Sequence, residues 1–413
     1  MFASLSALTP DGRLLFAARC LRMFGYGFLS VVLALYLSAI GLSDGDIGLL
    51  ISLTLLGDAA ISLWITTAAD RIGRKRMLVF GSVLMLFAGI LFSLTREFHW
   101  LLLAAIVGVI SPSGKEVGPF LSIEQAALAE IVTGERRTEA FAWYNLFGSL
   151  ATALGAFCGG ATTQWMEQRG FGEVQSYLPV IWGYAAIGGV LIAMFFGLSR
   201  SVEPAVPVRG GILGLDRSRR VVAKLSALFA LDAFGGGFII DGLVAYWLHK
   251  RFEADPLVLG TIFFWTNLFG GLSGLIAARW AKRFGLVNVM VFTHLPSHVL
   301  LVLVPLVPGL GWAALLLLVR SLISQMDIPT RQAYTMAVVD PHERSAAAGV
   351  TTVARSFGAG LSPLMVGPML ANPATLGLPF FLAGGVKIVY DYFLYREFIS
   401  LREPQEPRER VAN

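Results

Sequence analysis

Charged residues stand inside long apolar stretches of this sequence. An ionisable side chain in such a stretch is costly when the stretch crosses a bilayer, and it then usually pairs with an opposite charge, lines a water-filled path or relays protons. We therefore expect these residues to form a substrate and proton pathway. They are Arg22, Asp58, Lys115, Glu116, Glu124, Asp232, Asp241, Asp327, Arg331 and Arg355.

Two ion pairs follow from the depths of four of these residues. A helical rise of about 1.5 Å per residue puts Arg22 and Glu124 each roughly 12 Å from one end of their helices. Asp232 and Arg331 come out at nearly the same depth. We predict that Arg22 pairs with Glu124 and Asp232 with Arg331. Such pairs either serve transport or only fix helix register.

Two carboxylic acids are candidates to carry a coupled proton. Asp58 stands in the apolar run Leu-Leu-Gly-Asp-Ala-Ala, and Glu116 follows Ser-Pro-Ser-Gly-Lys. Asp, Glu and His side chains in membrane spans commonly relay protons. A protonated residue with a packing role only is the alternative for Asp58.

The fourth apolar stretch contains Pro112, Gly114, Gly118 and Pro119. Proline removes a helical hydrogen bond and frees a carbonyl group. Broken backbone is tolerated at membrane depth only against protein or a water-filled cavity. We expect a binding or gating element here, with a simple proline kink as the alternative.

The composition points to lipid as the solvent for most of the surface. Of 413 residues, 56% are hydrophobic and 14% are charged, against about a quarter charged in soluble proteins. The net charge of +5 is weak support for a nucleic-acid partner, and we expect none. Cys20 and Cys158 lie in apolar stretches and make neither a disulfide framework nor a metal cluster.

No phosphate loop, zinc-ligand spacing or nucleophile motif is present. We therefore predict neither enzyme activity nor a cofactor or metal on this chain.

The apolar stretches predict an all-α membrane protein with twelve transmembrane helices. A bilayer needs about 20 apolar residues per helix, and the stretches do not show the alternation of barrel strands. They cover residues 14–40, 46–68, 77–95, 99–131, 137–162, 176–198, 221–249, 255–279, 286–306, 310–338, 344–370 and 374–399.

The basic residues indicate the orientation. Loops on one side carry most of the Lys and Arg, for example 71–76, 200–220 and 279–283, whereas the other side has few. By the positive-inside rule we expect a multi-pass protein of the cytoplasmic (inner) membrane with both termini in the cytoplasm.

The chain divides near its midpoint and repeats. Residues 199–220 are rich in Pro, Gly and Arg and read as a cytoplasmic linker between an N-terminal bundle (1–198) and a C-terminal bundle (221–413). Phe24–Phe28 recurs as Phe234–Phe238, about 210 residues later, and two further matches keep this register. A parallel repeat of two six-helix halves is typical of transporters.

The loop after the second stretch reads Ala-Asp-Arg-Ile-Gly-Arg-Lys-Arg over residues 69–76. It resembles the conserved loop motif of the major facilitator superfamily, with Thr66 and Ala68 in place of the usual Gly and Leu. The equivalent loop in the second half carries Lys282 and Arg283. The resemblance implies the superfamily fold and a gating latch formed by Asp70, Arg71, Gly73 and Arg74, with Lys282 and Arg283 in the second loop. A plain basic loop is the alternative.

Residues 155–160, Gly-Ala-Phe-Cys-Gly-Gly, are similar to the antiporter motif of that superfamily, with Ala156 in place of proline. We therefore expect a secondary transporter that works by alternating access, as a monomer, and exports a small molecule in exchange for protons. A uniporter or importer of a small organic anion, clamped by Arg22, Lys115 and Arg331, is one alternative. A transporter-like sensor without net transport is another.

We predict that the linker lies in the cytoplasm. A cysteine at Ser218 should react with an impermeant thiol reagent only after the membrane is permeabilised, because the basic loops stay inside. Labelling in intact cells would contradict this topology.

Overall fold

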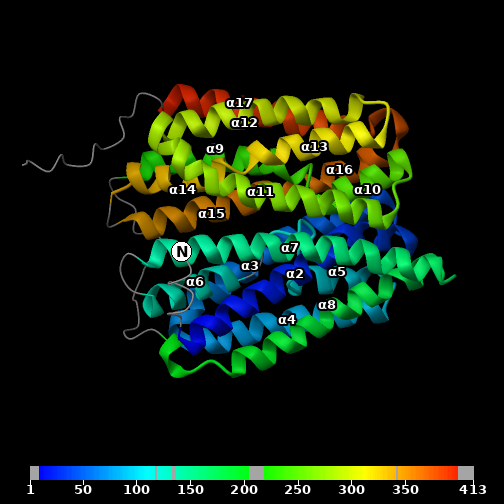
Figure 1. Cartoon of the computed structure of the whole chain (residues 1–413), viewed down its shortest axis with the longest axis horizontal. Coiled ribbons are helices and arrows are strands. Elements are labelled where there is room, and N and C mark those ends of the chain that lie inside the picture. The colour runs from blue at the N-terminus through cyan, green and yellow to red at the C-terminus, as the bar shows by residue number, and fades with distance from the viewer. Residues whose placement is uncertain (1–8, 117–118, 133–135, 204–217, 341–342, 399–413) are drawn as a thin grey trace, which may run out of the picture.

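Two groups of nearly parallel helices lie side by side in the computed structural model, which describes residues 9–116, 119–132, 136–203, 218–340 and 343–398 (Figure 1). Over these residues the chain is helical and contains no strand. The first group consists of α2 (Pro10–Ala39), α3 (Asp44–Ile72), α4 (Arg74–Leu94), α5 (Phe98–Val107), α6 (Phe120–Ile131), α7 (Arg136–Gln168), α8 (Glu173–Phe196) and the short η1 (Arg200–Val202).

The second group repeats this order in the C-terminal half. It consists of α9 (Arg219–Gly237), α10 (Asp241–Phe252), α11 (Pro256–Phe284), α12 (Leu286–Leu303), η2 (Val304–Leu306), α13 (Leu310–Ser324), α14 (Asp327–Val338), α15 (Arg344–Leu361), α16 (Pro363–Ala371), η4 (Pro373–Thr375) and α17 (Leu378–Phe398).

The twelve predicted spans are present. Within the described residues, nine helical segments are long and apolar enough to cross a bilayer. The other three spans are each made of two shorter helices, namely α5 with α6, α13 with α14, and α15 with α16. The prediction of an all-α protein with two six-helix bundles is confirmed.

Large apolar side chains on the outside of the bundles fit a lipid solvent. Trp64, Trp100, Phe196, Phe292 and Trp312 each expose more than half of their surface. Water would penalise this much aromatic exposure by roughly 25 cal/mol per Å², whereas lipid tails do not. The bundles therefore keep their apolar faces turned outward as well as inward.

Breaks interrupt the fourth, seventh and tenth spans, in addition to the step between α15 and α16. The predicted break in the fourth span is present, because α5 ends at Val107 and α6 begins at Phe120, with Gly114 at a φ of 62° between them. Two further breaks were not predicted. They separate α9 from α10 at residues 238–240, and α13 from α14 at residues 325–326.

Glycines bring the two halves into backbone contact. A Cβ added to Gly160 on α7 would lie 2.1 Å from the carbonyl oxygen of Pro256 on α11. One added to Gly48 on α3 would lie 2.5 Å from the carbonyl oxygen of Pro363 on α16. Real Cβ atoms do not approach oxygen this closely, so these positions need glycine for the halves to pack as they do.

Polar contacts join the halves at the end where α2 stops and α3 begins. Asp44 at the start of α3 accepts a hydrogen bond from the Tyr246 hydroxyl (2.7 Å) and pairs with the Lys250 ammonium (2.6 Å), both on α10. The backbone N–H of Gly242 donates to the carbonyl oxygen of Pro112 (3.0 Å). This end of the molecule is closed.

The loop motif forms a tight turn that is anchored by the start of the linker. Gly73 ends α3 with a φ of 115°, a conformation that favours glycine, and Gly285 does the same with a φ of 84° after α11. The Glu203 carboxylate accepts hydrogen bonds from the backbone N–H groups of Arg74 (2.7 Å) and Lys75 (3.2 Å). It therefore caps α4 and complements the positive end of its dipole.

The side chains of Asp70, Arg71 and Lys282 lie outside the described residues, and Arg283 is exposed. The latch role of this motif stays a prediction. Ser218 is buried, because its N–H donates to Glu343 (2.8 Å) and its hydroxyl accepts from the Asp340 N–H (3.0 Å). The exposed Arg219 is therefore a better labelling position for the topology test.

Closure of the α7–α11 contact should depend on the absence of a side chain at Gly160. We predict that Gly160→Val separates the halves at the closed end, because its side chain would overlap the Pro256 carbonyl group. Gly189→Val on α8 is the matched control, since a Cβ there meets nothing within 4 Å.

Spin labels at the exposed positions Arg169 and Glu253, in a background with both native cysteines replaced, report the separation by electron-electron resonance. The distance distribution should move to longer distances in Gly160→Val and stay unchanged in Gly189→Val. An unchanged distribution in both variants would show that this glycine contact does not hold the end closed.

Candidate functional site

A cavity of about 360 Å³ lies between the two halves, and charged residues from both halves line it. Eight of the ten residues singled out from the sequence are on its wall. They are Asp58, Lys115, Glu116, Asp232, Asp241, Asp327, Arg331 and Arg355. Arg22 and Glu124 are fully buried behind the wall.

Arg22 is the centre of a buried ion network in the N-terminal half. Its guanidinium meets both carboxylate oxygens of Glu124, at 2.5 and 2.8 Å, in a bidentate pair. It also lies 2.9 Å from Glu116 and stacks 4.5 Å above the Phe120 ring centre. Bidentate charge-assisted bonds are the strongest of their kind, so α2 is held here to the fourth span, both at its break (Glu116) and at α6 (Glu124).

Glu116 bridges Arg22 to a second arginine. The Arg19 guanidinium lies 2.7 Å from the other Glu116 oxygen, and its Nε donates to the Tyr144 carbonyl oxygen (3.1 Å). The Tyr144 hydroxyl in turn donates to Glu124. We call Arg19, Arg22, Glu116 and Glu124 the Arg22 network. Protonation of Glu116 would remove one carboxylate from two buried guanidinium groups.

Asp232 occupies the corresponding place in the C-terminal half with the charges reversed. Its carboxylate meets Arg331 at 3.2 Å, Arg355 at 3.1 Å and the Lys387 ammonium. Arg331 also pairs with Asp327, one turn earlier on α14, at 2.7 Å. We call these five residues the Asp232 network. It ties α9, α14, α15 and α17 together.

Both ion pairs predicted from the sequence are in contact, but neither is isolated. Arg22 has two carboxylates, and Asp232 has three cations. A scheme of one cation per anion was therefore too simple. The role of these residues in transport stays a prediction.

Asp58, Lys115 and Asp241 face the cavity outside these two networks. The Ser62 hydroxyl lies 3.5 Å from the Asp58 carboxylate. Lys115 and Asp241, from opposite halves, are electrostatic neighbours.

Sequence reasoning missed four charged residues of the site. Arg19 was not singled out, although its i, i+3 spacing from Arg22 puts both on one helix face. Arg320 lines the cavity. Lys387 and Asp391 stand four residues apart in the last apolar stretch. This spacing puts both side chains on one helix face, and it could have identified the pair from the sequence.

Residues 15–363 match the sequence profile of the Major Facilitator Superfamily. The chain belongs to this superfamily. It is 31% identical over 434 aligned residues to the uncharacterized membrane protein YJR124C of Saccharomyces cerevisiae, covering 97% of each chain.

The chain is also 21% identical over 376 aligned residues to the quinolone resistance protein NorA of Staphylococcus aureus, covering 88% of this chain and 90% of NorA. Among solved structures it is similar in fold to the nucleoside transporter NupG, with a TM-score of 0.72, 14% identity, and coverage of 94% of this chain and 99% of NupG. These likenesses agree with a transporter rather than an enzyme.

Removal of single members of the Arg22 network should cost unequal amounts of stability. Arg22→Ala leaves Glu124 buried without a cation, and breaking one buried partner typically costs about 3–5 kcal/mol. Glu124→Ala should cost less, because Arg22 keeps Glu116 at 2.9 Å. The double variant should be more stable than Arg22→Ala alone.

Thermal unfolding of the purified variants measures this cycle, with Tyr144→Phe as a control that keeps both charges. Additive losses in the double variant would show that Arg22 and Glu124 are not energetically coupled.

Proposed function

We propose that this protein is a proton-coupled secondary transporter that exports a small molecule by alternating access. The observation that carries the proposal is a charged cavity between two six-helix halves, with one end closed by contacts between those halves. A cavity that opens to one side at a time is the basis of transport by rocking of two repeats.

The wall suits an amphipathic molecule that carries charge. Leu55, Val244 and Phe263 supply apolar surface. Lys115, Arg320 and Arg355 can hold an anionic group, while Asp58 and Asp241 can hold a cationic one. The volume of about 360 Å³ falls in the range of drug-sized ligand sites.

Similarity to NorA, a quinolone resistance protein, supports export and makes a quinolone the first compound to test. Similarity to NupG, a nucleoside transporter, makes a nucleoside the second. We also propose that both termini face the cytoplasm, that the chain works as a monomer, and that the 70–74 and 282–283 loops latch the halves in the opposite state.

The organic-anion importer remains the rival, with a changed clamp. Arg22 is enclosed by Glu116 and Glu124 behind the wall, so an anion would meet Lys115, Arg320 and Arg355 instead. Counterflow in proteoliposomes separates transport of either kind from a sensor without transport.

Transport should depend on a pH gradient and on a cavity carboxylate. In proteoliposomes that hold a quinolone or a nucleoside, an acid exterior should accelerate efflux of at least one compound. Asp58→Asn should abolish this acceleration and keep exchange at equal concentrations, because a permanently neutral side chain cannot cycle a proton. Glu116→Gln tests the second candidate.

Glu116→Gln also removes a partner of Arg19 and Arg22, so its thermal unfolding must be measured alongside. Efflux that is equally fast with and without the gradient in the unaltered protein would overturn proton coupling. Gradient-driven efflux in both variants would place the proton elsewhere.

A further inference from the structure

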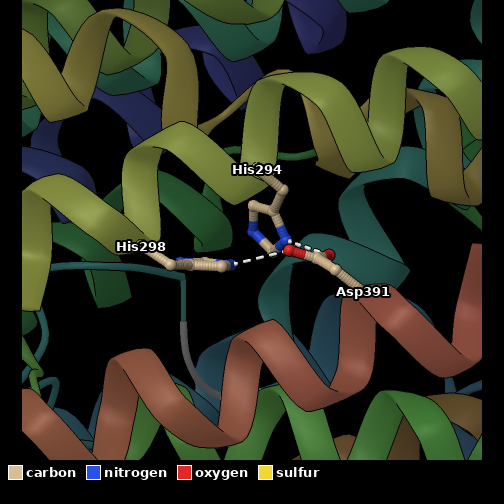
Figure 2. Close-up of side chains that lie close together, drawn as sticks. All are labelled: His294, His298 and Asp391. Carbon is tan, nitrogen blue, oxygen red and sulfur yellow. Dashed lines mark hydrogen bonds and ion pairs between the residues drawn. The ribbon is translucent and has the colours of Figure 1, made fainter.

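A second group of titratable side chains lies beside the cavity and outside both ion networks. His294 and His298 stand one turn apart on α12, and Asp391 projects between them from α17 (Figure 2). The Asp391 carboxylate lies 3.1 Å from His294 Nδ1 through one oxygen and 3.3 Å from His298 Nε2 through the other. We call these three residues the histidine triad.

The triad is buried in the C-terminal half. His294, His298 and Asp391 expose 4%, 0% and 1% of their surfaces. His298 Nε2 and Asp391 Oδ2 have no hydrogen-bond partner in the described part of the chain, although they face each other. Buried polar atoms are normally satisfied, so this poorly aligned contact leaves both atoms with capacity for a further hydrogen-bond partner.

Asp391 determines which nitrogen of His294 is basic. A carboxylate only accepts hydrogen bonds, so His294 Nδ1 must carry a hydrogen to bond with Asp391. In the neutral ring this leaves Nε2 as the acceptor. Nε2 lies 3.9 Å from an Asp327 oxygen, and His294 is part of the cavity wall.

We propose that the histidine triad binds a second coupling proton, at Nε2 of His294, with Asp391 as the positioning residue. This inference rests on the proposed proton coupling and adds a proton site in the half opposite Asp58. A hydronium ion in the cavity transfers its proton to the Nε2 lone pair, so one O–H bond breaks, one N–H bond forms and water is left; the imidazolium returns the proton to water later in the cycle.

Binding of this proton would alter the cavity wall through Asp327. An imidazolium beside Asp327 competes with Arg331, which now holds Asp327 at 2.7 Å and Asp232 at 3.2 Å. Asp232 also pairs with Arg355 and Lys387. A change in charge at His294 therefore alters the ion pairs of the cations that line the cavity.

The surroundings favour a proton over a metal ion. The ionisable neighbours are Asp327 and Arg331 on α14, Arg320 on α13, Asp232 on α9, Lys387 and Asp391 on α17, together with Tyr390 and His298. On α11, the described Arg279 and Arg283 are exposed near the helix end.

With Arg355, which pairs with Asp232, these neighbours hold three carboxylates and four cations. A proton adds one positive charge to this group, whereas a divalent ion adds two. In addition, the 3.1 Å contact between His294 Nδ1 and Asp391 is a hydrogen-bond distance.

Nitrogen NMR of the protein labelled with ¹⁵N-histidine tests the site without a substrate. One ring that keeps Nδ1–H at high pH should gain a proton at Nε2 when the sample is acidified. Its signals should be missing from His294→Gln. A His294 ring that stays neutral throughout the pH range in which the protein remains folded would overturn the proposal.

Zinc provides the rival outcome in the same spectra. If Zn²⁺ shifts the His294 and His298 signals at micromolar concentration, and chelation lowers the unfolding temperature of the purified protein, the triad is a metal site and the proposal fails.

Quinolone or nucleoside efflux tests the coupling. His294→Gln and Asp391→Asn should lose acceleration by an acid exterior and keep counterflow, whereas the exposed His99→Gln should behave as the unaltered protein. Gradient-driven efflux in His294→Gln would contradict only the proton site at the histidine triad and would leave the proposed function standing. Absence of gradient-driven efflux in the unaltered protein would instead defeat the proposed function, while the NMR titration would still report on the site.

Discussion

A buried charge without a partner is the main cost that this structure has to avoid. Moving an ion from water into a low-dielectric interior costs several kcal/mol even after relaxation. The molecule meets this constraint by gathering its interior charges around Arg22 in one half and Asp232 in the other. Helices that would otherwise hold only apolar surface are thereby fixed in register, because each charge must reach a particular partner.

The two networks act within a half rather than between the halves. The Arg22 network joins α2 to the break and to α6 of the fourth span, and the Asp232 network joins α9, α14, α15 and α17. Contacts between the halves are of another kind, with glycines against backbone carbonyl groups and a few polar contacts at one end. Each half can therefore move as a unit without separating its buried ion pairs.

Spans were predictable because lipid imposes a length and an apolar composition on every helix. The expected break in the fourth span was visible from its prolines. The break before Asp241 follows the run Gly235–Gly237, which weakens a helix, and Pro329 stands in the first turn of α14 after the other break. These signals were present in the sequence but were not used. Pairs such as Arg22 with Glu124 followed from depth. Depth does not show how many partners share one carboxylate, so the roles of Arg19 and Lys387 became visible only in three dimensions.

The histidine triad could not be assembled from sequence for a related reason. His294 and His298 share a helix face by spacing, but their partner Asp391 lies 93 positions after His298 in the chain. Helix packing between α12 and α17 brings the three side chains together.

The hydrogen bond from Gly242 to Pro112 joins the broken fourth span to the start of α10 through backbone atoms alone. A scan of side-chain substitutions would not detect this hydrogen bond at position 112, since every residue supplies the same carbonyl group. At position 242 the scan would report a steric effect, because a Cβ there would lie 2.7 Å from the Pro112 oxygen and 3.0 Å from that of Ser30. Genetics would thus record a packing glycine where the molecule has a physical link between its two halves.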